Sequence, residues 1–64
     1  MRHTRVRLKS GDVKYSVETA YAVSAKVNEG RAANLLIELE ADRIPTGQKF
    51  YIDPNEVESV EEDN

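Results

Sequence analysis

The sequence contains no cysteine and no tryptophan, and it has a single histidine among its 64 residues. Without cysteine the chain has neither disulfides nor thiolate-bound metals, which stabilise many small domains. The lone imidazole of His3 lies beside arginines, with no nucleophile or second metal ligand at a recognisable spacing. We therefore expect no catalytic residue, no metal and no cofactor, and interpret the chain as non-enzymatic.

Long apolar runs are also missing. No stretch approaches the roughly 18 apolar residues that a membrane-spanning helix requires. The basic start of the chain, residues 1–5, is not followed by the apolar segment of a signal peptide. These absences predict a cytoplasmic protein without a membrane partner.

The chain has little room for a hydrophobic core. We expect a single domain over residues 1–64, with frayed ends at 1–3 and 61–64. A core of this size supplies a net stability of only about 3–5 kcal/mol. Because disulfides and metals are excluded, self-association is the remaining source of stability, and we predict a homo-oligomer.

Two alternating segments open the sequence. Residues 4–9 alternate, with Thr4, Val6 and Leu8 on one face and three cations on the other. Residues 13–17 alternate again, with Val13, Tyr15 and Val17 expected to face the core. The intervening residues 10–12 favour a turn, so the pair predicts a β-hairpin.

A helix is expected next, over residues 18–29, where alanines and valines recur at helical spacing. Ser16 is a candidate N-cap. Glu18 falls near the positive end of the helix dipole. Gly30 is the residue at which we expect the helix to end.

The second half of the chain predicts two further strands. Residues 34–40 alternate, with Leu35, Ile37 and Leu39 on one face, and a connection over residues 41–48 leads to a strand at 49–53. A turn at residues 54–56 precedes either a helical turn or a short fifth strand. The predicted fold is α+β, of order ββαββ(β), with one helix packed on one face of a small, mainly antiparallel sheet.

Residues 47–60, GQKFYIDPNEVESV, form a strand that ends in Ile-x-Pro and continues as Val-x-x-Val. This segment resembles the closing segment of many small uncharacterised bacterial and phage proteins. The resemblance covers under a quarter of the chain and implies a way of sealing a sheet, with no catalytic residue to transfer. It favours an accessory protein of bacterial or phage origin.

Charge is divided between the two ends of the sequence, with cations in the first nine residues and acids in the last twelve. One interpretation is that the two ends lie side by side and neutralise each other. The other is a nucleic-acid-binding sheet face, although the acidic pI near 5.0 opposes it. The cations of that face would be Arg5, Arg7, Lys9, Lys14 and Lys49.

Leu36 and Tyr51 are expected on the outer face of the sheet, among charged residues. Neighbouring apolar side chains within a charged rim are typical of a protein interface. We therefore predict a small self-associating module that binds protein through Leu36 and Tyr51. The alternatives are the nucleic-acid-binding protein and a binder of a small ligand at an oligomer interface.

Overall fold

The computed structural model describes residues 3–41 and 48–63, and it confirms the α+β class and the ββαββ order. The long connection expected at 41–48 falls mostly outside the described residues. In chain order the elements are β1 (His3–Leu8), β2 (Val13–Ser16), α1 (Ala20–Ala33), β3 (Ile37–Glu40), β4 (Lys49–Ile52), the 3-10 turn η1 (Pro54–Glu56) and β5 (Val57–Asp63).

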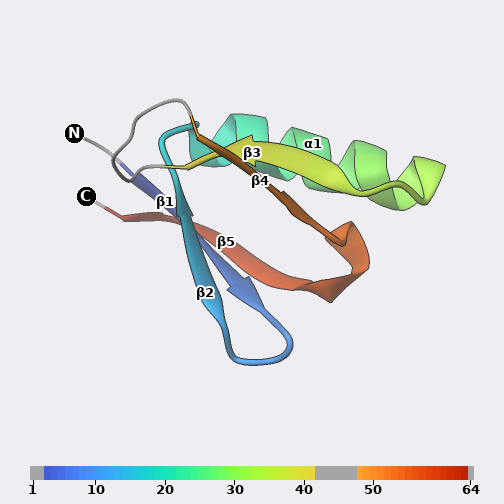
Figure 1. Cartoon of the computed structure of the whole chain (residues 1–64), viewed down its shortest axis with the longest axis horizontal. Coiled ribbons are helices and arrows are strands. Elements are labelled where there is room, and N and C mark those ends of the chain that lie inside the picture. Colours follow the sequence, from blue (N-terminus) through green and yellow to red (C-terminus); the bar gives the residue numbers. More distant parts are fainter. Residues whose placement is uncertain (1–2, 42–47, 64) are drawn as a thin grey trace.

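The described strands form two small antiparallel sheets, where the sequence predicted one. The first has the order β2-β1-β5, and the second consists of the hairpin β3-β4 (Figure 1). An isolated bridge between Ser16 and Ala41 joins β2 to the end of β3. Helix α1 packs along β3 and also contacts η1, β1 and β5, so it holds the two sheets together.

The ends of the chain are neighbours in the first sheet. β1 pairs antiparallel with β5, and Arg5 lies opposite Glu61. Their side chains form an ion pair of 3.3 Å between Arg5 Nη2 and Glu61 Oε2. The structure thus supports the interpretation in which the basic and acidic ends neutralise each other. β5 continues to Asp63, into the stretch where fraying was expected.

The inward face of β2 differs from the prediction. Ser16 is fully buried opposite Thr4, whereas Tyr15 is half-buried on the other face, opposite Arg5. A buried serine is tolerated here because its hydroxyl donates to the Glu40 carbonyl at 2.7 Å and accepts from the Glu18 amide at 3.1 Å. The expectation that Val13 and Tyr15 face the core was therefore wrong.

Both ends of α1 also differ from the prediction. Thr19, and not Ser16, is the N-cap, because its hydroxyl accepts a hydrogen bond of 3.1 Å from the Ala22 amide. The helix continues past Gly30 to Ala33 and ends at Asn34, which adopts the left-handed conformation with φ 57°. Asparagine tolerates this conformation better than most residues.

Gly30 allows the helix to approach β3 and η1 closely. A Cβ atom at position 30 would lie 2.5 Å from Ile37 Cγ2, 3.0 Å from Pro54 Cγ and 3.1 Å from the Leu35 carbonyl oxygen. This glycine is buried in the last part of α1, where the helix crosses the start of β3. Its role is therefore close packing, and the expected role as a helix terminator was wrong.

The buried core draws on both sheets and on α1. Aliphatic side chains dominate it, and Leu8, Phe50 and Val60 pack against its margin. The fifth strand expected as one of two possibilities is present as β5, and η1 before it is capped by the Asp53 side chain. The core residues are Val6, Val23, Val27, Ile37, Leu39, Ile52 and Val57.

Candidate interaction surface

The outer face of the β3-β4 hairpin is the surface for which the sequence predicted a role in binding. Glu38 lies opposite Tyr51, and Glu40 lies opposite Lys49, so these four side chains share one face. The other face carries Ile37, Leu39 and Ile52, which are buried in the core. We call the outer face, together with Leu36 directly before β3, the hairpin surface.

Leu36 and Tyr51 are the apolar part of the hairpin surface. Their residues are 65% and 64% exposed, and Leu35 at 65% and Tyr21 at 87% are the other strongly exposed large hydrophobic residues of the described structure. Tyr51 lies on the outer face opposite Glu38, whereas Leu36 lies directly before β3 and outside the paired register. The register places Tyr51 on the outer face, and the placement of Leu36 beside it stays a prediction.

A mixed pair of charges flanks Tyr51. Lys49 Nζ lies 3.0 Å from Glu38 Oε1, and both side chains remain substantially exposed. The hydrogen bond and the negative charge of Glu38 raise the pKa of Lys49 above its ordinary value. The surface thus presents one cation, Lys49, and two anions, Glu38 and Glu40, beside its aromatic ring.

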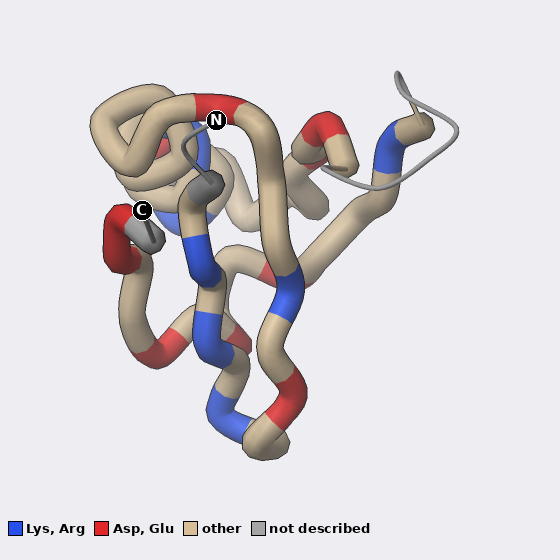
Figure 2. The backbone as a smooth tube through the Cα atoms, turned by 90° about the vertical axis from the view of Figure 1, so that its left-hand side faces the viewer, with Lys and Arg blue, Asp and Glu red and all other residues tan. Residues whose placement is uncertain are grey.

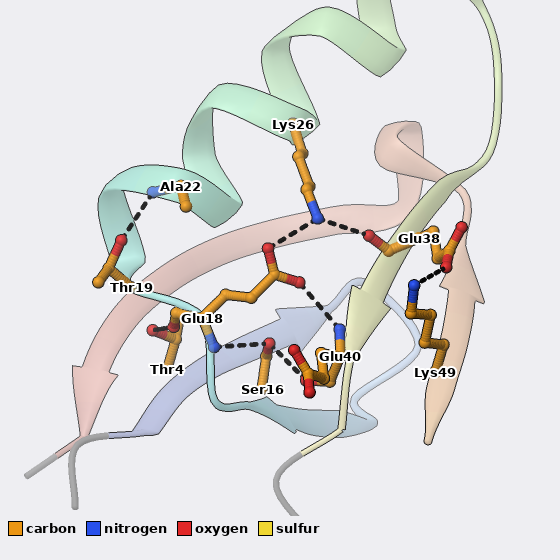
Figure 3. A network of polar contacts seen from close by, with 9 residues as sticks. All are labelled: Thr4, Ser16, Glu18, Thr19, Ala22, Lys26, Glu38, Glu40 and Lys49. Carbon is orange, nitrogen blue, oxygen red and sulfur yellow. Dashed lines mark hydrogen bonds and ion pairs between the residues drawn. The ribbon is translucent and has the colours of Figure 1, made fainter. Parts of the chain in front are cut away.

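The edge of β3 that faces away from β4 meets β2 only at its end, through the bridge of Ser16 to Ala41, and side chains close the rest (Figure 3). Lys26 Nζ donates to the Glu38 carbonyl at 3.0 Å, and Glu18 Oε2 accepts from the Glu40 amide at 2.9 Å. Lys26 and Glu18 also form an ion pair of 2.7 Å with each other. Together they satisfy backbone groups that would otherwise form an open sheet edge.

Glu18 is held at its backbone as well as at its carboxylate. Its carbonyl accepts from the Thr4 hydroxyl at 2.6 Å, and its amide donates to the Ser16 hydroxyl. Burial raises the pKa of the Glu18 carboxyl, but the hydrogen bonds from Lys26 and the Glu40 amide, with the positive charges of Lys26 and Lys49, outweigh it. The pKa of Glu18 is consequently lowered, and the carboxylate is ionised at neutral pH.

A shallow hollow of about 410 Å³ lies between α1 and the hairpin. Its lining consists of three carboxylates and two ammonium groups, which belong to Glu18, Lys26, Glu38, Glu40 and Lys49. Both of its lysines are engaged in ion pairs, Lys26 with Glu18 and Lys49 with Glu38, so the carboxylates of the lining outnumber its ammonium groups by one. Within residues 3–41 and 48–63, no three His, Asp or Glu side chains gather in a metal-holding arrangement.

The cations proposed for nucleic-acid binding do not form one surface. Arg5 and Arg7 share a face of β1 with Tyr15, beside the acidic strand β5 (Figure 2). Lys14 lies opposite Val6 and therefore belongs to the other face of the same sheet.

The remaining two cations lie elsewhere. Lys9 is in the turn after β1, where its amide donates to the Glu56 carbonyl at 2.8 Å. Lys49 is on the separate β3-β4 hairpin. A single strand of nucleic acid following one face of a sheet would therefore meet only some of the five positions.

Sequence reasoning missed the pairing of Glu18 with Lys26. The two residues are eight positions apart, across the start of α1, and neither spacing nor composition marks them as partners. Their common target is the backbone of β3, which only the folded arrangement reveals.

Comparison of the chain with models of protein families, with curated proteins and with solved structures finds no match in any of the three. In the part of the chain that the structure describes, no helix is both long and apolar enough to cross a membrane.

Proposed function

We propose that this protein is a non-enzymatic interaction module that associates with a second copy of itself through the hairpin surface. The observation that carries the proposal is the exposure of Tyr51, at 64%, among the charged side chains of the outer face, with Leu36, at 65%, directly before β3. An aromatic and an aliphatic side chain inside a charged rim have the composition of a protein-binding centre.

Charge complementarity favours a second copy as the occupant. The rim contains both a cation, Lys49, and an anion, Glu38, in fixed positions. In a two-fold interface, the same surface of both copies forms the contact. A surface that carries both positive and negative charges can therefore place opposite charges against each other across the axis. A patch of one sign would instead repel its copy.

The test is the mass of the protein in solution as a function of concentration, measured by light scattering after size-exclusion chromatography. We expect a dimer, and we expect Leu36→Asp and Tyr51→Asp each to weaken association at least tenfold. Tyr21→Asp is the matched control, because Tyr21 is an 87% exposed tyrosine on α1. A wild-type monomer at all concentrations, or equal effects of Tyr21→Asp and Tyr51→Asp, would refute the proposal.

A further inference from the structure

The sheet edges of the described structure are covered unequally. Glu18 and Lys26 close the free edge of β3. The start of β5 is covered by Arg31, whose guanidinium donates to the Pro54 and Val57 carbonyls at 3.1 and 2.9 Å. The rest of β5 carries several acidic side chains, which would repel a second copy of the same strand.

The outer edge of β4 differs from these edges. The Ala41 amide donates to the Gln48 carbonyl at 2.7 Å, so alternate residues of β4, Phe50 and Ile52, exchange backbone hydrogen bonds with β3. Lys49 and Tyr51 must then direct their amide and carbonyl groups away from β3. Within residues 3–41 and 48–63, β4 pairs with no strand other than β3.

The open edge extends one period beyond β4. Asp53 has extended backbone angles, φ −79° and ψ 118°. Its carbonyl accepts from the Glu56 amide at 2.9 Å, so only its amide continues the outward backbone groups of the edge. Along this edge the outward positions therefore read Lys49, Tyr51 and Asp53, a cation, an aromatic ring and an anion. This order is self-complementary, because reversing the strand exchanges the two charges around a central tyrosine.

We propose that β4 pairs antiparallel with β4 of a second copy, about a two-fold axis that passes beside Tyr51. This inference rests on the proposed self-association and specifies how it occurs. Each Lys49 then lies opposite Asp53 of the second copy, and the two Tyr51 residues face each other at the axis. The two hairpins become one four-stranded antiparallel sheet, and Leu36 of each chain flanks the central pair of rings.

The other symmetric registers fit the charges less well. An axis at Lys49 places two ammonium groups directly opposite each other, which is unfavourable. An axis at Phe50 places Lys49 opposite Tyr51, so Asp53 has no oppositely charged residue across from it. Only the axis at Tyr51 matches opposite charges on both sides.

The decisive experiment is a charge exchange between two variants, Lys49→Glu and Asp53→Lys. In each variant alone, both charged contacts join like charges, and we expect the dimer dissociation constant to rise at least tenfold. In an equimolar mixture of the two variants, the glutamate introduced at position 49 of one chain lies opposite the lysine introduced at position 53 of the other. At the second contact, the unaltered Asp53 of the Lys49→Glu chain lies opposite the unaltered Lys49 of the Asp53→Lys chain. We therefore expect the mixture to form a heterodimer with near wild-type affinity. A mixture that remains monomeric, or single variants that dimerise like wild type, would overturn the inference.

A second measurement covers the case in which Asp53→Lys impairs folding, since the Asp53 side chain caps η1. The chain has no cysteine, so Tyr51→Cys introduces a single thiol. Across the proposed axis the two Cα atoms of residue 51 would be about 5.5 Å apart, inside the range of about 4.4–6.8 Å that a disulfide spans. We expect oxidation to cross-link Tyr51→Cys at least tenfold faster than the control Tyr21→Cys, and equal rates would count against the pairing.

The two proposals fail in different ways. A wild-type chain that is monomeric at every concentration removes both. In a second outcome, Leu36→Asp disrupts the dimer, but Lys49→Glu and Asp53→Lys dimerise like wild type and residue 51 does not cross-link. The hairpin surface would then still be the interface. That result would replace edge pairing with packing of one hairpin surface on another.

Discussion

Replacing Gly30 by alanine is expected to lower the free energy of unfolding, although the same change inside most helices raises it. The helical preference of alanine over glycine favours the variant by about 1 kcal/mol. Against this gain, the new methyl group would lie 2.5 Å from Ile37 Cγ2 and 3.0 Å from Pro54 Cγ. Neither neighbour can move away easily, because Ile37 is β-branched and buried and the side chain of Pro54 is a ring. Overpacking of this kind costs about 1–3 kcal/mol or more.

The difference is a net loss of up to about 2 kcal/mol. Each kcal/mol corresponds to a fall in Tm of about 4–8 °C for a domain of this size. Thermal and urea unfolding followed by circular dichroism measure the change. Ile37→Leu removes the Cγ2 methyl at nearly constant volume, so Gly30→Ala with Ile37→Leu should recover part of the loss. A higher Tm for Gly30→Ala, or additive effects in the double variant, would refute the close-packing role.

Variants at three further positions test the local structure. Glu18→Gln should reduce stability by about 1 kcal/mol at neutral pH. The pKa of Glu18 is lower in the folded protein than its unfolded value of 4.5, so the ionised carboxylate stabilises the fold above pH 4.5. This stabilisation is lost as the pH falls through the folded pKa. The difference in free energy of unfolding between wild type and Glu18→Gln should therefore shrink in acid titrations. Thr19→Ala should cost about 1 kcal/mol in urea unfolding through loss of the N-cap, and an unchanged midpoint would exclude that cap. Asn34→Gly should keep or raise Tm, whereas Asn34→Ala should lose about 1 kcal/mol because the position is left-handed; equal Tm values for the two would argue against this geometry.

The element order could be predicted because most segments carry a clear period, and the faces of β1 and β3 follow from it. The face of β2 could not, because Ser16 is buried by partners from distant parts of the chain, including the Glu40 carbonyl. A glycine near the end of a helical pattern usually indicates a terminator, but Gly30 serves a contact with Ile37 that local sequence does not show. Such failures arise where a tertiary contact overrides a local preference.

The candidate surface could be predicted only in part from the sequence. Alternation places Tyr51 and Glu38 on an outer face, and the register confirms that they are neighbours. In the described part of the chain β4 pairs only with β3, and this could not be predicted. The Glu18–Lys26 pair that covers the other edge of the hairpin has no signature in the sequence.

The pairing of β1 with β5 has a consequence for how the chain is made and folds. His3 lies opposite Asp63, and Leu8 lies opposite Val57, so the central strand of the first sheet receives its second neighbour from about fifty to sixty residues later. During synthesis β1 can form its hairpin with β2 early, but its other edge stays unprotected until β5 has left the ribosome. Contacts of such long sequence separation slow folding and lengthen the exposure of nascent strands to aggregation. Ribosome-stalled chains that lack β5 should therefore be captured by chaperones far more than chains that include it.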